Sequence, residues 1–245
     1  MKRERACGIN AVDALLAHHG ERIIRIWAAD GGPRIQALVA RAAGQHIPVQ
    51  QARPAAMDKL AEGDIHQGIV AEFRAVEPLQ EADLSDIIDK AGPETLLLLL
   101  DQVQDPHNLG ACLRSAAAAG ANAVVIPRDR AVGMTPAVRR AAAGAVDIVP
   151  LVEVPNLART MKRLQESGVW CIGLAGEADE SLYAIHLEGP LALVIGGEEQ
   201  GLRQLTRKRC DRLARIPMHG STESLNVSVA TGIALFETNR QRGSK

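Results

Sequence analysis

Apolar positions along the chain follow two alternating patterns. Short aliphatic runs, such as Leu96 to Leu100, are typical of strands that are buried on both faces. Between these runs lie longer segments whose apolar residues recur at helical spacing, as from Leu157 to Glu166. Strands separated by helices of this length predict a parallel, doubly wound α/β sheet.

Residues 1–76 predict a small α/β domain that precedes the main sheet. Its expected helices run from Asn10 to Gly20, Pro33 to Ala43 and Ala55 to Ala61, and its expected strands from Ile23 to Trp27, Ile47 to Gln50 and Gly68 to Val76. Residues 77–93 are acidic, contain two prolines and include only a short amphipathic piece. We interpret them as a linker.

Residues 94–245 predict the main parallel-sheet domain. Its expected strands are Leu96 to Leu100, Ala123 to Ile126, Ile148 to Val152, Val169 to Leu174, Leu191 to Ile195 and Leu213 to Ile216. Its expected helices are Asn108 to Ala119, Pro136 to Ala143, Leu157 to Glu166, Leu202 to Lys208 and Leu225 to about Arg240.

Composition mainly argues against classes of function. The chain has 28 basic and 29 acidic residues, so no overall charge attracts it to nucleic acid or to a membrane. Its five aromatic residues are too few for a base-stacking platform. An RNA partner would therefore need a local basic patch, or else these residues form a solvated helix face. The best candidates are Arg203, Arg207, Lys208, Arg209, Arg212 and Arg215.

The four cysteines are widely spaced and include no Cys-x-x-Cys pair. This spacing argues against a zinc site and against a disulfide framework, and it favours free thiols in a reducing compartment. The longest aliphatic run is far too short to span a bilayer. We expect a cytoplasmic protein with neither a metal nor a membrane partner.

Three segments of the C-terminal half combine a Gly- or Ser-rich turn with polar side chains, each after a predicted strand. They run from Asp105 to Arg114, from Ile195 to Arg203 and from Ile216 to Ser228. Open α/β sheets bind ligands in the crevice outside the carboxyl ends of their strands. The chain lacks both a Gly-x-Gly-x-x-Gly turn and a Walker lysine motif, which argues against a classical nicotinamide or phosphate-cradle site.

Individual residues in these segments allow a structural or a chemical interpretation. Asn108 and Ser224 suit helix caps, and Arg114 alone could be a surface residue. Arg114 is, however, surrounded in sequence by small and apolar residues, so its guanidinium would need an anionic partner, for which Glu198 is the obvious candidate. Asn226, between Leu225 and Val227, is harder to explain as a surface residue.

The three segments, in this order and spacing, resemble the signature motifs of the SpoU (TrmH-type) branch of the SPOUT RNA methyltransferases. The resemblance covers the chain from about Leu96 to its end. Residues 1–76, with Gly8 to Val12 and His66 to Ala71, resemble the ribosomal-protein-like domain that binds substrate in family members acting on 23S ribosomal RNA. This domain has no basic cluster along its sequence, so RNA recognition would rest on shape and phosphate contacts. Arg25, His66 and Gln67 are plausible contacts.

The resemblance implies more about the fold and the ligand. The parallel sheet of residues 94–245 would carry a deep trefoil knot, and the protein would be a homodimer whose interface helps to complete the site. S-adenosylmethionine would be held largely by backbone contacts. The implied cofactor-binding residues are Gly196, Gly201, Ile216, Met218 and Leu225.

The implied reaction is 2′-O-methylation of a guanosine ribose in 23S ribosomal RNA. The implied catalytic residues are Asn108, Arg114, Glu198, Ser224 and Asn226. In the family Arg114 would be the base, but a guanidinium does not readily lose its proton. Arg114 could equally stabilise the developing oxyanion and a neighbouring phosphate while Glu198 orients it, and the sequence does not separate these roles. Two other functions stay open, a ribose methyltransferase of the same family that acts on tRNA and a non-catalytic RNA-binding assembly factor.

Overall fold

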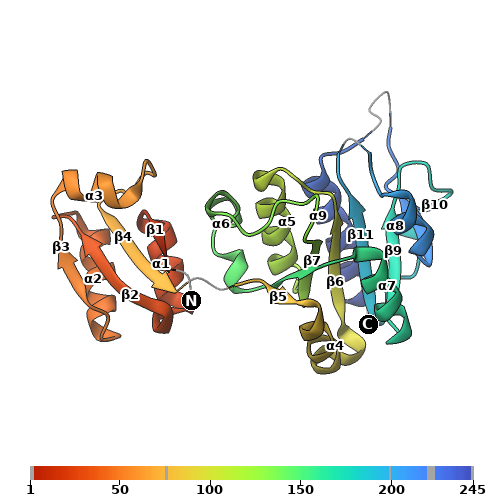
Figure 1. Ribbon diagram of the computed structural model, residues 1–245, viewed down its shortest axis with the longest axis horizontal. Helices are drawn as coiled ribbons and strands as arrows, with labels where there is room; N and C mark the ends of the chain where they lie inside the picture. Colours follow the sequence, from red (N-terminus) through yellow and green to blue (C-terminus); the bar gives the residue numbers. More distant parts are fainter. Residues whose placement is uncertain (1–2, 75–76, 199, 220–223, 244–245) are drawn as a thin grey trace. The chain divides into compact units, whose positions relative to one another are not determined.

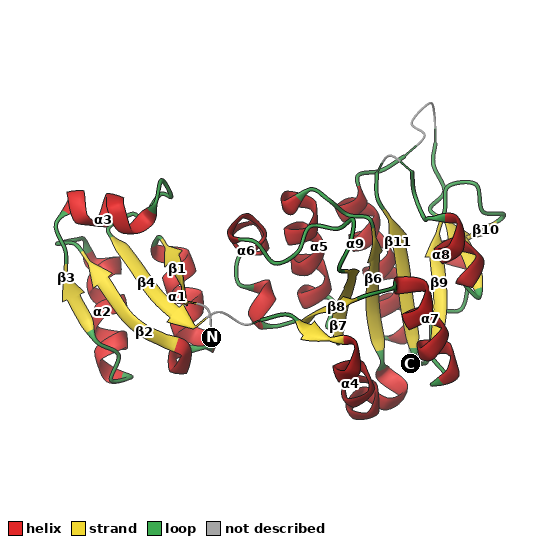
Figure 2. Ribbon diagram, viewed as in Figure 1, coloured by secondary structure: helices red, strands yellow, loops and turns green. Residues whose placement is uncertain are grey.

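The computed structural model describes residues 3–74, 77–198, 200–219 and 224–243. The chain divides into two compact units, Met1–Glu77 and Pro78–Lys245, each built around its own β-sheet (Figures 1 and 2).

The first unit is a four-stranded sheet in the order β1-β4-β2-β3. Its elements are β1 (Arg3–Cys7), α1 (Ile9–His18), β2 (Ile23–Ala28), α2 (Pro33–Gly44), β3 (Val49–Gln51), α3 (Pro54–Ala61) and β4 (Ile69–Arg74). Strand β4 runs antiparallel between β1 and β2, whereas β3 is parallel to β2. The charged strand β1 was not predicted, because its sequence lacks the apolar alternation of a half-buried strand. Val76, the predicted end of the last strand, lies outside the described residues.

The second unit is an eight-stranded parallel sheet in the order β10-β12-β9-β11-β6-β7-β8-β5. Its strands are β5 (Leu79–Gln80), β6 (Leu96–Asp101), β7 (Ala123–Pro127), β8 (Leu151–Val154), β9 (Trp170–Leu174), β10 (Glu180–Ser181), β11 (Leu191–Gly196) and β12 (Arg212–Arg215). Its helices are α4 (Leu84–Ala91), α5 (Pro106–Ala118), α6 (Pro136–Ala142), α7 (Leu157–Glu166), α8 (Gln204–Arg209) and α9 (Val227–Arg242). The predicted parallel α/β fold is confirmed.

Helices cover both faces of this sheet, which explains the uninterrupted leucines of β6 (Figure 1). Leu96, Leu98 and Leu100 point into the core formed with α5, α6 and α9. Leu97 and Leu99 point the other way, into the core formed with α4 and α7. Because successive side chains of a strand face opposite sides, a strand buried on both faces must be apolar throughout.

All but the first residue of the predicted linker, residues 78–93, belong to the second unit, so the predicted linker is wrong. Strand β5 pairs with β8, and Leu84 of α4 is buried in the second core. The Glu81 carboxylate accepts hydrogen bonds from Arg159 (3.1 Å) and from the Thr160 hydroxyl (2.8 Å) on α7. The acidic composition thus reflects pairing with a distant helix and not the solvation of a flexible connection.

The strand predicted at Ile148 to Val152 also differs from the structure. It begins only at Leu151, and Ile148 lies in the preceding turn with 61% of its surface exposed. The apolar run hid the boundary, since Ile148 fits a strand pattern as well as its neighbours do.

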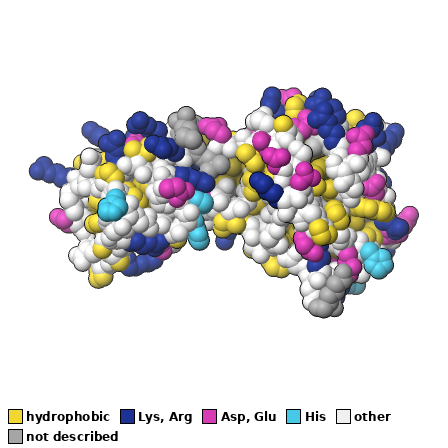
Figure 3. Space-filling view, turned by 90° about the horizontal axis from the view of Figure 1, so that it is seen from below, with side chains coloured by type: hydrophobic (Ala, Val, Ile, Leu, Met, Phe, Trp, Pro, Cys, Tyr) yellow, Lys and Arg dark blue, Asp and Glu magenta, His cyan; other side chains and the backbone are white. Residues whose placement is uncertain are grey.

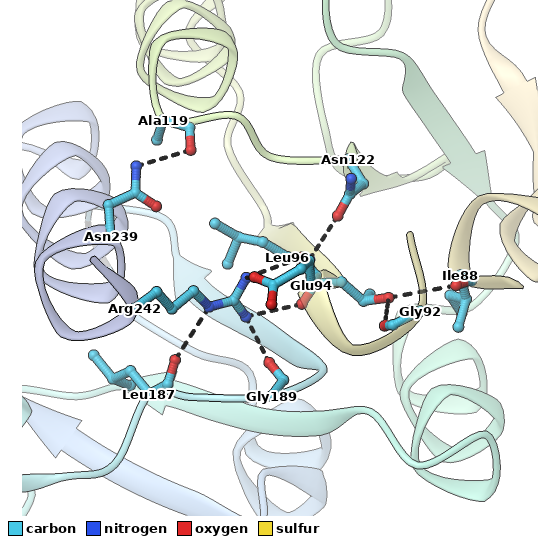
Figure 4. Close-up of polar contacts among 11 residues, drawn as sticks. Ile88, Gly92, Glu94, Leu96, Ala119, Asn122, Leu187, Gly189, Asn239 and Arg242 are labelled. Carbon is cyan, nitrogen blue, oxygen red and sulfur yellow. Dashed lines mark hydrogen bonds and ion pairs between the residues drawn. The ribbon is translucent and has the colours of Figure 1, made fainter. Parts of the chain in front are cut away.

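The carboxyl end of α9 is tied to the amino-terminal edge of the sheet by Arg242 (Figure 4). Its guanidinium donates to the backbone oxygens of Glu94 (2.9 Å), Thr95 (3.0 Å) and Gly189 (2.5 Å), and more weakly to Leu187 (3.4 Å). Burial among these carbonyl groups lowers the pKa of Arg242, with the Glu94 carboxylate acting in the opposite direction. The longest helix of the unit is therefore fixed at the end opposite to its polar N-terminus.

Candidate active site

Three side chains from the three motif segments meet outside the carboxyl ends of β6 and β11. The Glu198 Oε1 atom accepts hydrogen bonds from the Asn108 amide (2.9 Å) and from the Asn226 amide (2.5 Å). The Asn226 amide also donates to the Asn108 Oδ1 atom (3.0 Å). We call Asn108, Glu198 and Asn226 the polar cluster. Within the motifs, Glu199 and residues 220–223 lie outside the described residues.

Helix starts place both asparagines. Asp105 caps α5 by accepting from the backbone N–H groups of His107 (3.1 Å) and Asn108 (3.2 Å), which puts Asn108 in the first turn. Asn226 caps α9, since its Oδ1 atom accepts from the Ser228 N–H group (2.9 Å). The cap uses the amide oxygen of Asn226 as an acceptor, which leaves its amide nitrogen directed toward Glu198. Both helix N-termini, with their partial positive charge, therefore lie beside the carboxylate.

Two adjacent glycines allow the loop that carries Glu198 to fold back tightly on itself beside the end of β6. A Cβ atom on Gly196 would lie 2.0 Å from the carbonyl carbon of Gly201, and one on Gly197 would lie 2.6 Å from the Gln102 oxygen. The Gly197 N–H group donates to the Asp101 oxygen at 2.8 Å. A side chain would overlap the backbone at both positions, so the close backbone contacts require glycine at 196 and at 197.

Asp101, which sequence reasoning missed, fixes the far end of the same loop. Its buried carboxylate accepts from the Arg203 backbone N–H group (3.0 Å) and from the Arg203 Nε atom (2.6 Å). A signal existed in the sequence, because an acid that ends an otherwise aliphatic buried strand needs a partner. The partner itself could not be inferred, since it lies 102 residues further along the chain.

All five predicted cofactor residues line one cavity. They are Gly196, Gly201, Ile216, Met218 and Leu225. Glu198 and Ser224 line it as well, so the polar cluster and the cavity share the Glu198 side chain. Sequence reasoning missed a further wall, Leu174 to Gly176, which follows β9 beside β11 in the sheet.

Arg114 does not join the polar cluster. It is exposed on α5 and makes no hydrogen bond or ion pair with any residue that the structure describes. The predicted ion pair between Arg114 and Glu198 is therefore wrong, and the two asparagine amides occupy Glu198 instead. Arg114 lies six positions after Asn108 on the helix, so their side chains point about 120° apart around the helix axis.

The predicted basic patch is largely engaged in internal ion pairs. Arg203 binds Asp101, Arg207 binds Glu177, and Arg212 binds Glu180 at 2.9 Å. Arg215 donates to the backbone oxygens of Ala178 (2.6 Å) and Asp179. These contacts hold residues 177–180, which continue the cavity wall at 174–176, so this cluster mainly shapes the cavity.

Cys112 lies buried behind the polar cluster, between α5 and α9. Its Sγ atom lies 3.4 Å from the Thr231 hydroxyl. Burial raises the pKa of Cys112 to about 11, opposed by the Thr231 hydrogen bond and assisted by the charge of Glu198. At neutral pH it is a protonated thiol, which excludes it as a nucleophile.

The three N-terminal residues singled out as RNA contacts have partners inside the first unit. The Gln67 Oε1 atom accepts from the Ile9 N–H group (3.1 Å), and the His66 Nδ1 atom accepts from Gly68 (3.0 Å). Arg25 forms an ion pair with Glu72 at 3.1 Å. Their contacts support the fold of the unit, and an RNA role for each stays a prediction.

Among the described residues, no helix is long and apolar enough to cross a membrane. The same part of the chain contains no group of three or more His, Cys, Asp or Glu side chains arranged to hold a metal ion.

Comparison with known proteins identifies the family. A model described as the SpoU rRNA Methylase family matches residues 95–236, and one described as RNA 2′-O ribose methyltransferase substrate binding matches residues 5–79. The chain is 51% identical over 241 residues to the 23S rRNA (guanosine-2′-O-)-methyltransferase RlmB of Pseudomonas aeruginosa, covering 98% of this chain and 97% of that protein. It is 50% identical over 245 residues to the protein of the same name from Shewanella oneidensis, covering 99% of each.

A solved structure matches both units. The crystal structure of the AdoMet-bound rRNA methyltransferase from Sinorhizobium meliloti has a TM-score of 0.75 at 26% identity, covering 97% of this chain and 87% of that one. The resemblance seen in the three motifs is thus confirmed across the whole chain. The protein belongs to the SpoU rRNA methylase family.

Proposed function

We propose that this protein transfers a methyl group from S-adenosylmethionine to the ribose 2′-hydroxyl of a guanosine in 23S ribosomal RNA. The observation that carries the proposal is the shared position of Glu198, which lines the cavity and also binds Asn108 and Asn226. Relatives of about 50% identity over the full chain carry this activity in their names. A cytoplasmic location follows from the proposed substrate.

The cavity fits S-adenosylmethionine by its chemistry. Gly196 and Gly201 expose backbone groups, while Ile216, Met218 and Leu225 supply the apolar surface that an adenine requires. When bound, the cofactor supplies a methyl group on a positively charged sulfur. The negative charge of Glu198 at the cavity wall favours a cation there.

The polar cluster orients groups around the acceptor oxygen. The amides of Asn108 and Asn226 are held in one orientation by Glu198 Oε1, so they position a ribose without further reorganisation. The other oxygen, Oε2, makes no hydrogen bond within the described part of the chain and can accept one from a 2′-hydroxyl. In the transfer the new bond joins the ribose oxygen to the methyl carbon, the methyl–sulfur bond breaks, and the hydroxyl proton leaves to solvent. Ser224, on the cavity wall, offers another hydroxyl to the substrate.

We further propose that Arg114 acts at the active site of a homodimer. It lies exposed on α5, outside its own chain's polar cluster, and a dimer would bring it beside substrate, where a guanidinium stabilises an oxyanion. Helix α9 exposes Val229 (49%) and Phe236 (52%), which are seven residues apart and therefore on one side of the helix. Such an apolar stripe suits a subunit contact. Light scattering should give a dimer mass for the wild type and a monomer mass for Phe236→Glu.

The trefoil knot is also part of the proposal. The match of the second unit to the SpoU rRNA Methylase family supports it, since the sequence motifs resemble those of knotted members. The protein can be cleaved by limited proteolysis within the proposed knot and then refolded. The yield of folded protein, compared with that of the intact chain, would measure the contribution of the knot to stability.

A methylation assay tests the activity. Purified protein is incubated with labelled S-adenosylmethionine and a 23S ribosomal RNA transcript, and the mark is mapped. Asn226→Asp keeps the capping oxygen for Ser228 but replaces the amide donor that faces Glu198 by an oxygen. We expect its kcat to fall about 100-fold or more, as when one preorganised donor is removed, with an unchanged circular dichroism spectrum.

The matched control is Asn239→Asp on the same helix, whose side-chain amide donates to the Ala119 oxygen (2.9 Å), away from the polar cluster. It should lose some thermal stability and keep wild-type kcat. Full activity in Asn226→Asp would remove the proposed role of the polar cluster. Methylation of tRNA but not of the ribosomal transcript would show that the substrate is tRNA. Failure to bind the cofactor in calorimetry would point to a non-catalytic RNA-binding factor.

A further inference from the structure

The antiparallel register of the first unit brings four arginines onto one face of its sheet. Arg3 of β1 lies directly opposite Arg74 of β4. Two residues along, Arg5 of β1 and Arg25 of β2 lie on either side of Glu72. Residues opposed in an antiparallel sheet share a face, so these side chains gather on one surface. We call Arg3, Arg5, Arg25 and Arg74 the arginine face.

The core helices α1 and α2 cover the other face of the sheet. Ala6, Ala71 and Ile26, which are opposed in the register and alternate with the arginines, pack in the core with Val12 and Leu38. The arginine face is thus not part of this core. Helix α3 covers part of this face, where Val70 is buried and where Arg5 donates to the Leu60 oxygen (3.1 Å) and pairs with Glu62 (2.9 Å).

Two of the four arginines are compensated and two are not. Arg25 pairs with Glu72 and lies 5.5 Å above the Trp27 ring, which holds its guanidinium in place. Arg3 and Arg74 are exposed, and neither has a hydrogen bond or ion pair to any residue in the described ranges. Like charges directly opposite one another destabilise a strand pair. An anionic partner would stabilise this arrangement, and the described residues provide none to Arg3 or Arg74.

We propose that the arginine face is the surface on which the first unit binds the phosphate backbone of the ribosomal RNA substrate, an inference that rests on the function proposed above. Guanidinium groups bind phosphate oxygens through paired hydrogen bonds, and phosphate contacts position a protein without reading bases. The substrate-binding family model, which matches residues 5–79, covers three of the four arginines. Charge complementarity argues against an apolar or basic partner, and the RNA substrate-binding match of the unit favours RNA over an acidic protein.

The charge distribution elsewhere supports this choice. Figure 3 shows basic and acidic side chains side by side on both units. On the second unit, Arg207 of α8 is paired with Glu177 and Arg212 of β12 with Glu180. The uncompensated pair on the sheet is thus a better phosphate site than the basic patch that the sequence suggested.

The test removes the opposed pair. The double variant Arg3→Gln with Arg74→Gln deletes two charges, keeps polar side chains of similar length and relieves the repulsion between the strands. Binding to a 23S ribosomal RNA fragment is measured by filter retention at several KCl concentrations. We expect the affinity to fall about tenfold and the salt dependence to become less steep by about 1.4, roughly 0.7 for each lost phosphate contact on a single strand.

The kinetic pattern separates docking from catalysis. The KM for RNA should rise with the affinity loss, whereas kcat at saturating RNA and the dissociation constant for S-adenosylmethionine should stay at wild-type values. The melting temperature should stay the same or rise, because a repulsion is removed; a purely structural role for the pair would lower it.

The matched control is Arg34→Gln with Arg41→Gln, which removes two charges from α2 on the opposite side of the sheet, where they contact Asn10 and Asp13. It should leave the salt dependence unchanged. Wild-type affinity and salt dependence in the Arg3/Arg74 variant would overturn the inference while the function stands, since the wild type methylates the transcript in parallel. A wild type that neither binds nor methylates the transcript would overturn both.

Discussion

A methyl group at position 196 has no room in this structure. A Cβ atom on Gly196 would lie 2.0 Å from the carbonyl carbon of Gly201, 2.2 Å from its oxygen and 2.3 Å from the Leu202 nitrogen. All three atoms belong to the backbone, so rotation of a side chain cannot relieve the overlap. Gly196→Ala must therefore displace the loop that closes the proposed cofactor cavity.

The size of the effect follows from the displacement. Ordinary contact begins at 3.4 Å, so the 201–202 backbone must move by about 1.4 Å. That movement pulls Arg203 away from Asp101, whose hydrogen bonds measure 2.6 and 3.0 Å. Overpacking alone costs about 1–3 kcal/mol, and partial loss of the charged hydrogen bonds adds about 1–2 kcal/mol. We expect destabilisation of about 3 kcal/mol, a fall in melting temperature of roughly 6–12 °C.

Calorimetry with S-adenosylmethionine and thermal unfolding measure the two consequences. A misplacement of about 1 Å in an active site can slow a reaction roughly 100-fold, so Gly196→Ala should methylate the transcript about 100-fold more slowly and bind the cofactor more weakly than the wild type. The control is Gly176→Ala, which lines the same cavity but has no atom within 4 Å of the added Cβ. It should keep the wild-type melting temperature and bind the cofactor within a few-fold. Unchanged affinity and stability in Gly196→Ala would refute the close contact between Gly196 and the Gly201–Leu202 backbone, and with it the proposed shape of the cofactor cavity.

Three further predictions concern other parts of the second unit. Arg242→Lys cannot satisfy the carbonyl groups around the guanidinium and should lose about 2–3 kcal/mol in urea unfolding, whereas Arg240→Lys, exposed on the same helix end, should lose little. Arg215→Gln removes the hydrogen bond to the Ala178 oxygen and loosens the cavity wall there. The KM for S-adenosylmethionine should then rise about tenfold, which is 1.4 kcal/mol, while RNA affinity stays constant. An equal loss of RNA affinity would instead support the basic patch as an RNA-binding surface. Between pH 9 and 11 the unfolded state ionises the Cys112 thiol and the folded state does not, so stability should fall with rising pH by up to about 1.4 kcal/mol per unit. Cys112→Ala should lose that part of the slope in urea titrations at pH 8, 9.5 and 10.5.

Local signals predicted most elements of the second unit correctly. Helix α7 begins and ends where the pattern placed it, because Asn156 caps it and its apolar stripe ends at the turn before Gly168. Strand β6 was evident because burial on both faces leaves no polar position inside it. These features depend on residues within a few positions of one another.

The failures involve partners that are distant in sequence. The acidic stretch 77–93 resembled a linker because the side chains that bind Glu81 lie 78 and 79 residues further on. Arg114 was assigned to Glu198, but helix geometry turned it away and the amide of Asn108 took its place. The opposed arginines escaped notice, since Arg3 and Arg74 come from the two ends of the first unit.

The class of fold, the three motif segments and the chemistry that they resemble were all evident from the sequence, because periodicity, caps and motif residues act over short distances. Which polar groups meet depends on the three-dimensional packing. Asn226 reaches Asn108 across 118 residues, and Glu198 reaches Asn108 across 90. Such pairings follow from strand order and loop crossing, and these depend on how the whole chain packs its two-sided sheet.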